Sequence, residues 1–258
     1  MKQIDLNCDM GEGFGLYKLT DDEELIKHIS SANVACGFHA GDPMVMRKAV
    51  ALAKRQGVAV GAHPGLPDLM GGGRRYIKVE PAEIENYMIY QIGALKAFVE
   101  AEGMKLQHVK AHGPIYNYAM EDESWVKACV NAIVKIDPSV IYMVLGGEKG
   151  EMMVKVAQEA GLKVALEGFP DRAYLPKGTL VPRGQPGAVI LNSDEVAERA
   201  VRMATEGKVK AIDGTVIDLD VETLCFHGDN PESIQALQKV QKGMKRVGVE
   251  VARLGTFL

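Results

Sequence analysis

The sequence predicts an α/β fold in which seven parallel strands close into a barrel, with helices around it and one small extra hairpin. Short apolar segments alternate with longer helical patterns along almost all of the 258 residues, which is typical of βαβ units. Several strand segments carry polar side chains on one face and apolar side chains on the other. No repeat, low-complexity segment or linker interrupts this order, so we expect residues 1–258 to form one barrel domain.

The strand segments are short, apolar and bounded by turn residues. We expect them at residues 3–9, 32–39, 58–63, 107–112, 140–145, 163–167 and 223–227. The fifth segment is apolar throughout, which indicates a strand buried on both faces. The Asp213-Gly214 pair lies between apolar flanks and predicts the extra hairpin at 209–218.

The helices between these strands are marked by their first and last residues. We expect them from Thr20 or Asp21 onward and at 43–57, 81–102, 123–135, 149–160, 193–207 and 231–247. Pro43 and Pro81 suit a first helical turn, while Gly57 and Gly207 suit a helix end. The remaining long stretch, 168–187, is irregular, and a long loop in a compact barrel is usually functional or mobile.

The composition excludes several classes of protein. The chain is 47% hydrophobic and 25% charged, which is ordinary for a globular protein. Its formal charge of −4 argues against nucleic-acid binding, which normally needs a basic surplus. No apolar run approaches the roughly 20 residues that span a membrane, and residues 1–9 do not resemble a secretion leader. The four cysteines form no CxxC pair, so we expect a reduced, cytoplasmic protein.

The polar strand faces favour a closed barrel over an open sheet, because a barrel gathers them in its lumen. Alternation predicts the inward residues Asp5, Asn7, Asp9, Asn33, Gly37, His39, His108, Lys110, His112, Thr223 and His227. The ends of different strands contribute Asp9, His39, His63, His112, Glu167 and His227. Any one of these histidines is as readily a hydrogen-bonded structural residue as a catalytic one. Together they would meet at the carboxyl ends of the strands, where such a barrel holds its active site.

Three other features have both a structural and a functional interpretation. Lys110 lies between two histidines on one strand face, so we expect a lumenal ammonium that polarises a carbonyl or holds an anion. Arg74 and Arg75 follow three glycines and are either solvated charges or a fork for a carboxylate. The glycines of residues 11–15 have the spacing GxGxG, which fits neither a dinucleotide fingerprint nor a Walker loop.

A series of motifs runs in order along nearly the whole chain. These are LNCDMGE (6–12), NVACGFHAGDP (33–43), GAHP (61–64), PDL (67–69), GRR (73–75), VK (109–110), HG (112–113), YN (116–117), DRAY (171–174), LVPR (180–183), PGAV (186–189) and HGDNP (227–231). In this order they resemble the LamB/YcsF family. The resemblance implies a seven-stranded (β/α) barrel similar to the glycoside hydrolase/deacetylase superfamily.

The resemblance also implies an activity, the ATP-dependent opening of 5-oxoproline to L-glutamate. It implies a complex with 5-oxoprolinase subunits B and C, which would bind most of the ATP and explain why this chain lacks a nucleotide motif. The residues that match family motifs are Asp9, Glu12, His39, Asp42, His63, Arg74, Arg75, Lys110, His112, Asp171, Arg172, His227 and Asp229.

From these residues we predict roles in lactam hydrolysis. Asp9 or Glu167 is the expected general base toward water, and His112 a general acid/base. Lys110 is expected to stabilise the developing oxyanion or a phosphate. The predicted substrate-binding residues are Asn7, Glu12, His39, Asp42, His63, Arg74, Arg75, Asp171, Arg172, His227 and Asp229, with Arg74 or Arg75 on the substrate carboxylate.

Two other functions stay open on the sequence. A stand-alone deacetylase or amidohydrolase would bind a divalent metal ion through Asp9 with His39 and His63, or with His112. A non-catalytic subunit would bind the lactam without any need for the strand-end histidines.

Overall fold

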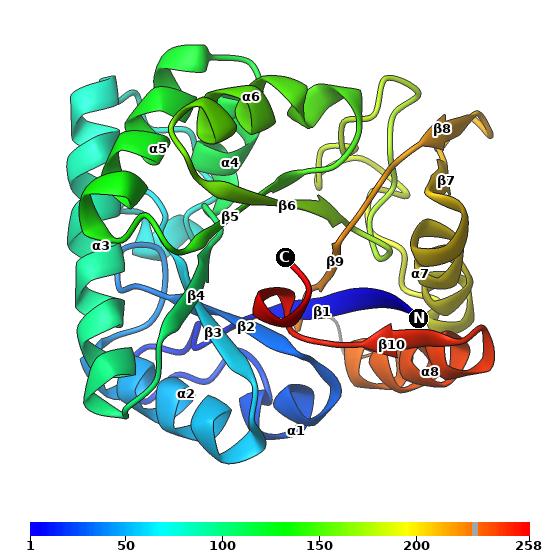
Figure 1. Ribbon diagram of the computed structural model, residues 1–258, viewed down its shortest axis with the longest axis horizontal. Helices are drawn as coiled ribbons and strands as arrows, with labels where there is room; N and C mark the ends of the chain where they lie inside the picture. Colours follow the sequence, from blue (N-terminus) through cyan, green and yellow to red (C-terminus); the bar gives the residue numbers. More distant parts are fainter. Residues whose placement is uncertain (229–231) are drawn as a thin grey trace.

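Seven parallel strands close into a barrel in the computed structural model, which describes residues 1–228 and 232–258 (Figure 1). The strands are β1 (Lys2–Met10), β2 (Ser31–Ala35), β3 (Ala59–His63), β4 (Leu106–Val109), β5 (Ile141–Leu145), β6 (Lys163–Gly168) and β9 (Thr223–Phe226). They pair in this order, and β9 pairs back onto β1. The predicted barrel is therefore confirmed.

Helices surround the barrel in Figure 1, and most follow the predicted boundaries within a few residues. They are α1 (Asp22–Leu25), α2 (Pro43–Gln56), α3 (Pro81–Ala101), α4 (Gly113–Ala119), α5 (Glu123–Ile136), α6 (Glu151–Glu159), α7 (Ser193–Glu206) and α8 (Ser233–Arg246). Gly57 ends α2 with a φ of 68°, a left-handed conformation that glycine adopts without strain. The short helix α4 was not predicted, and it begins directly after His112.

The predicted hairpin is present as β7 (Lys208–Lys210) and β8 (Val216–Asp218), which pair antiparallel. A further strand, β10 (Val249–Val251), was not predicted, because three residues are too few to show a period. It pairs in parallel with the first residues of β1. The chain then turns through residues 254–256 over the centre of the barrel in Figure 1, where Leu254 packs on Ile141 and Met143. The tail thus covers the amino ends of the strands.

Two predicted strands were too long, and the error affects the site. The segment 32–39 stops being a strand at Ala35, because Gly37 takes a φ of 93° and its N–H donates to the Ala40 carbonyl. The segment 107–112 stops at Val109, and His112 instead precedes the first residue of α4. Side chains beyond these ends are therefore positioned by turns and not by strand alternation.

The lower lumen is filled by a buried polar layer. The Asp5 carboxylate accepts hydrogen bonds from the hydroxyls of Ser30, Ser31 and Thr223 at 2.6–2.7 Å. Above it, His108 reaches across the lumen, and its Nε2 lies 2.7 Å from Asn33 Oδ1. On β3, Gly61 lies against the His108 ring. A Cβ at this position would lie 2.0 Å from His108 Nε2, so any residue larger than glycine would clash with the ring.

Asp5 predicts a specific pH dependence of stability. Burial raises the pKa of Asp5 from 3.8 to about 6, although the three hydroxyl hydrogen bonds oppose the rise. The folded state therefore holds this proton more tightly than the unfolded state, and its contribution is full below pH 3.8 and lost as the pH rises toward 6. We expect the free energy of unfolding of the wild type, relative to Asp5→Asn, to fall by about 2 kcal/mol between pH 4 and pH 7.

Urea unfolding of both proteins at several pH values measures this difference. The absolute stability of Asp5→Asn does not affect the test. The test compares the difference in free energy of unfolding between wild type and variant at each pH. A difference that stays constant, or that grows with pH, would contradict the buried protonated carboxyl.

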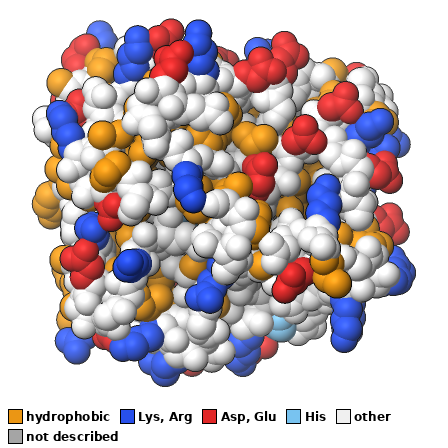
Figure 2. Space-filling view, in the orientation of Figure 1, with side chains coloured by type: hydrophobic (Ala, Val, Ile, Leu, Met, Phe, Trp, Pro, Cys, Tyr) orange, Lys and Arg blue, Asp and Glu red, His pale blue; other side chains and the backbone are white. Residues whose placement is uncertain are grey.

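The surface shown in Figure 2 carries acidic and basic side chains interspersed over the whole face, in keeping with the small net charge. Among the described residues, no helix combines the length and the apolar character needed to cross a membrane.

Candidate active site

Lys110 occupies the centre of the polar cluster at the carboxyl ends of the strands. Its Nζ donates to Asp9 Oδ1 at 3.0 Å and to Cys225 Sγ at 2.9 Å, and it lies 3.2 Å from Glu167 Oε1. The side chain is only 4% exposed. Burial alone would lower the pKa of Lys110, but the neighbouring Asp9 and Glu167 carboxylates hold it well above its usual value. The ammonium therefore stays charged, with its three N–H groups directed at three partners.

The Glu167 carboxylate is held in place from both sides. Its Oε1 accepts from Asn7 Nδ2 at 3.0 Å, and its Oε2 accepts from the Tyr116 hydroxyl at 3.0 Å. Asn33 in turn donates from Nδ2 to Asn7 Oδ1 and to Asp9 Oδ1. With every oxygen engaged and no exposed surface, Glu167 is suited to position Lys110 and not to take a proton from water.

Three histidines lie together beside Asp9. His63 Nε2 is 3.3 Å from Asp9 Oδ2 and 2.9 Å from His112 Nδ1. The outer nitrogens face backbone carbonyls: His63 Nδ1 is 2.8 Å from the Lys110 oxygen, and His112 Nε2 is 2.9 Å from the Gly72 oxygen. The His39 ring stacks on His112 at 3.9 Å, nearly parallel.

The protons of this cluster can be assigned from its partners. Carbonyl oxygens only accept, so His63 Nδ1 and His112 Nε2 carry protons. A second proton on His63 Nε2 can then be shared between Asp9 Oδ2 and the lone pair of His112 Nδ1. Burial alone would raise the pKa of Asp9, but the charges of His63 and Lys110 hold it well below its usual range.

The same arrangement fits a divalent metal ion in place of the shared proton. Donor atoms of His39, His63 and His112 lie within 4.8 Å of one another. Both ring nitrogens of His39 are buried, and neither has a hydrogen-bond partner. Burial holds the pKa values of His39 and His112 well below normal, so both rings are neutral and offer lone pairs. Metal-bound histidines typically donate their other N–H to a carbonyl, as His63 and His112 do here.

Asp171 and His227 form a dyad on the other side of Lys110. His227 Nδ1 is 2.7 Å from Asp171 Oδ2, which also accepts from the His227 backbone N–H. Burial alone would raise the pKa of Asp171, but the charge and hydrogen bonds of His227 outweigh this effect and lower it. The carboxyl group is therefore ionised. The His227 ring also stacks on Phe169. A ring nitrogen of His227, an Asp9 oxygen and Cys225 Sγ lie within 4.8 Å of one another, so the dyad faces the same centre.

Glu12 is the half-buried carboxylate of this centre. One of its oxygens lies within 4.8 Å of donor atoms of Asp9 and His112. Burial and the Asp9 charge raise the pKa of Glu12 above its usual value. A carboxylate with a raised pKa is better matched to proton transfer near neutral pH than Asp9, whose pKa is lowered.

Some predicted site residues lie elsewhere. Asp42 caps α2 through the N–H groups of Met44 and Val45 and also accepts from the Gly15 N–H, so it is structural. Arg75 is 64% exposed and paired with Asp68, so its predicted contact with the substrate carboxylate stays a prediction. Arg74 and Arg172 line a pocket next to the cluster. Asp229 lies outside the described residues.

Three contributors to the centre were not predicted as site residues. Alternation predicted that Asn33 faces the lumen, but no role was assigned to it, and the same alternation applies to Cys225, which lies between Thr223 and His227. Tyr116 lies on α4, the helix that was not predicted, and no sequence signal placed its hydroxyl against Glu167.

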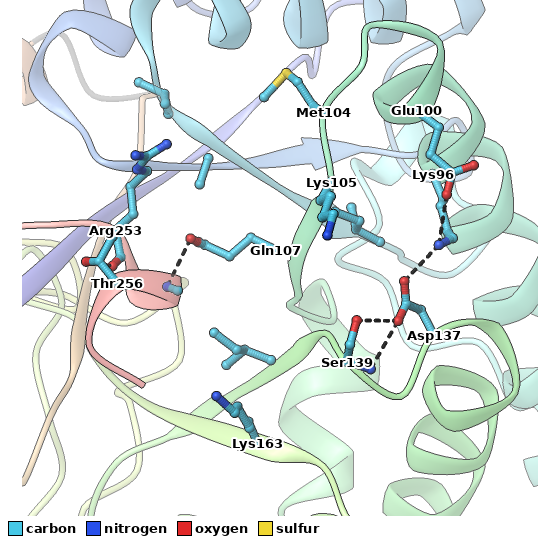
Figure 3. A pocket seen from close by; sticks show the side chains of 15 residues that line it. Lys96, Glu100, Met104, Lys105, Gln107, Asp137, Ser139, Lys163, Arg253 and Thr256 are labelled. Carbon is cyan, nitrogen blue, oxygen red and sulfur yellow. Dashed lines mark hydrogen bonds and ion pairs between the residues drawn. The ribbon is translucent and has the colours of Figure 1, made fainter.

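A separate hollow of about 730 Å³ lies at the amino ends of the strands (Figure 3). Its lining includes the first residues of β3, β4, β5 and β6. Its charged groups include Lys96, which is paired with Asp137 at 2.7 Å. The hollow contains none of the histidines, so the groups suited to acid-base chemistry lie at the opposite end of the barrel.

Comparisons with known proteins agree with the fold and show the family. The LamB/YcsF family model matches residues 4–258. The chain is 52% identical to the 5-oxoprolinase A subunit of Pyrococcus furiosus and 53% identical to that of Thermococcus onnurineus, in each case over 99% of both chains. Among solved structures, it is similar to a lactam utilization protein from Thermus thermophilus, at 45% identity and a TM-score of 0.90. That match covers 98% of this chain and 100% of the other.

Proposed function

The chain belongs to the LamB/YcsF family, and from this premise we propose that it opens the lactam ring of 5-oxoproline to give L-glutamate. The relatives that carry the name of the 5-oxoprolinase A subunit support this substrate, because they match over almost the full length of both chains. The observation that carries the proposal is the geometry at the strand ends. One centre is faced by a cluster of carboxylates and histidines and by a separate Asp-His dyad. Amide hydrolysis needs a base and an acid that act at one such centre.

Hydrolysis of a lactam needs a base for water and an acid for the leaving ring nitrogen. Glu12, with its raised pKa and half-buried position, is the base that we propose in place of Asp9 or Glu167. His227 is the acid that protonates the ring nitrogen as the C–N bond breaks, and Asp171 holds its ring in place. His112 borders the carbonyl side of the centre and orients water with Glu12.

Lys110 stabilises the negative charge on the oxygen that water adds to the ring carbon, next to the phosphorylated lactam oxygen. Two of its N–H groups are directed at carboxylates, but the third is directed at the Cys225 sulfur, which is a weak acceptor. An oxyanion that approaches from the side of Cys225 can accept a hydrogen bond from the third N–H, and only the weak contact with the sulfur is lost. Asn7, Asn33 and Tyr116 keep the two carboxylates, and through them the ammonium, in position.

A divalent metal ion, if bound, would be held by Asp9, His39, His63 and His112. It would polarise the carbonyl and make bound water more acidic. The unpartnered His39 nitrogens and the N–H groups that His63 and His112 direct at carbonyls support this assignment.

We place the ATP-dependent step with partner proteins, the 5-oxoprolinase subunits B and C. An amide is a poor electrophile, and phosphorylation of the lactam oxygen at the cost of ATP makes ring opening easier. This chain would receive that phosphorylated lactam. Water adds to the ring carbon, the C–N bond breaks as the ring nitrogen takes a proton, and a second water hydrolyses the resulting acyl phosphate to the γ-carboxylate of L-glutamate and free phosphate. The four cysteines are free thiols, which fits a reducing cytoplasm.

Reconstitution with the partner subunits tests this function. We expect glutamate from 5-oxoproline only when ATP, this chain and both partners are present. The chain is also assayed alone with simple acetamides and with added Zn²⁺. Hydrolysis of acetamides by the chain alone, without ATP-dependent glutamate release from the complex, would favour a metal-dependent amidohydrolase instead.

A further inference from the structure

A cationic pocket opens directly beside the active site. It has a volume of about 430 Å³ and lies between α4 and the irregular segment after β6. Its charged lining residues, among those described, are Arg74, Arg172, Lys177, Arg183 and Glu121. Among these described lining residues four are cations and one is a carboxylate, in a chain with more acidic than basic residues.

The pocket shares three chain segments with the active site. Arg74 follows Gly73, where an added Cβ would lie 2.4 Å from His39 Cβ and 2.7 Å from His112 Cδ2. Arg172 follows Asp171 of the dyad, and Gly113 of the pocket wall follows His112. Residues that line the pocket are therefore next in the chain to residues from both halves of the catalytic centre.

Arg172 is the fixed part of this pocket. The side chain is buried, and it donates from Nε to the Ala188 carbonyl and from Nη2 to the Val181 carbonyl at 2.7 Å. Carbonyl groups orient the guanidinium without neutralising it. Burial, together with the positive charge of Arg183, lowers the pKa of Arg172 to about 10, while the neighbouring Asp171 opposes this shift.

We propose that this pocket binds the phosphoryl group of an activated, phosphorylated lactam while the ring lies in the catalytic centre. A single guanidinium fork is enough for a carboxylate, whereas several cations suit a phosphoryl group with a charge near −2. Arg172 then orients the substrate, and Arg74, Arg183 and Lys177 contribute charge at the rim. This inference rests on the proposed function, because it takes the ATP-dependent product of the partner subunits as the ligand.

Binding of inorganic phosphate to the full-length chain, measured by isothermal titration calorimetry, tests the pocket without any turnover. We expect Arg183→Gln and Lys177→Gln each to weaken phosphate binding roughly tenfold, as expected for the loss of one charge-assisted contact. Lys208→Gln, on β7 outside the pocket, should leave it unchanged. A parallel titration with 5-oxoproline shows whether the pocket instead holds the substrate carboxylate.

Arg172→Lys keeps the charge but loses the fork, and should also weaken phosphate binding if the loop stays folded. Equal phosphate affinity in the wild type and the pocket variants would overturn the proposal, as would weakened 5-oxoproline binding with unchanged phosphate binding. Glutamate release by the reconstituted complex is measured on the same samples. If phosphate binds as expected and no glutamate forms, the proposed function fails and the pocket stands.

Discussion

Replacing Lys110 by Met is expected to lower kcat for glutamate release by the reconstituted complex about 10²–10³-fold. The reason is that the variant removes the only ammonium that contacts both Asp9 and Glu167 among the described residues and that can face a developing oxyanion. The KM for 5-oxoproline should change less than kcat, because the charge matters most when the oxyanion forms. Steady-state kinetics of the complex, with only this chain exchanged, gives both constants.

The variant also leaves two buried carboxylates without their cation, which can cost about 3–5 kcal/mol of stability. The double variant Lys110→Met with Glu167→Gln removes one of these carboxylates and should recover thermal stability. We expect it to stay inactive, whereas a purely structural lysine would let activity return. Lys96→Met is the matched control, since Lys96 also contacts two carboxylates but lies on α3 at the other end of the barrel. It should keep wild-type kcat.

The second large effect is expected at the Asp171–His227 dyad. His227→Ala removes the proposed proton donor to the ring nitrogen and should lower kcat about 10²–10⁴-fold. Asp171→Asn keeps the shape of the side chain, but it removes the charge and can turn the His227 ring into the wrong tautomer, so a loss of similar size is expected. The rate of glutamate release at saturating 5-oxoproline measures both variants.

His28→Ala is the control for this pair. His28 lies outside the site and contacts Gln241 and Glu24, so its loss should leave kcat unchanged. A His227→Ala complex with at least half of the wild-type kcat would assign the proton transfer to another group. Activity in Asp171→Asn close to the wild type, with His227→Ala inactive, would mean that His227 acts without its carboxylate partner.

The sequence predicted the barrel because apolar strand segments alternate with helices and several strands carry a polar face, which a closed barrel gathers in its lumen. It also predicted that Asp9, Lys110 and Glu167 share the lumen, and the ammonium contacts both carboxylates. These residues lie on strands or directly beyond them, where a period of two residues fixes the side of the sheet.

The rest of the site depends on turns, and the sequence does not specify their geometry. His39 and His112 were placed on strands, but a glycine turn and the start of α4 bring them together so that their rings stack. Arg75 was predicted to bind a carboxylate through its guanidinium group. In the structure this group pairs with Asp68, seven residues earlier in the same loop. The folded shape of each loop, and its contacts with loops that follow other strands, decide which side chains meet. No local sequence pattern specifies these contacts.

A crystal structure of the chain with L-glutamate, the product, tests the central claim most directly. We expect the new γ-carboxylate of glutamate beside Asp9, His63 and Lys110, and its amine beside His227. Glutamate bound instead in the hollow at the amino ends of the strands, among Lys105, Lys163 and Arg253, would contradict the account (Figure 3).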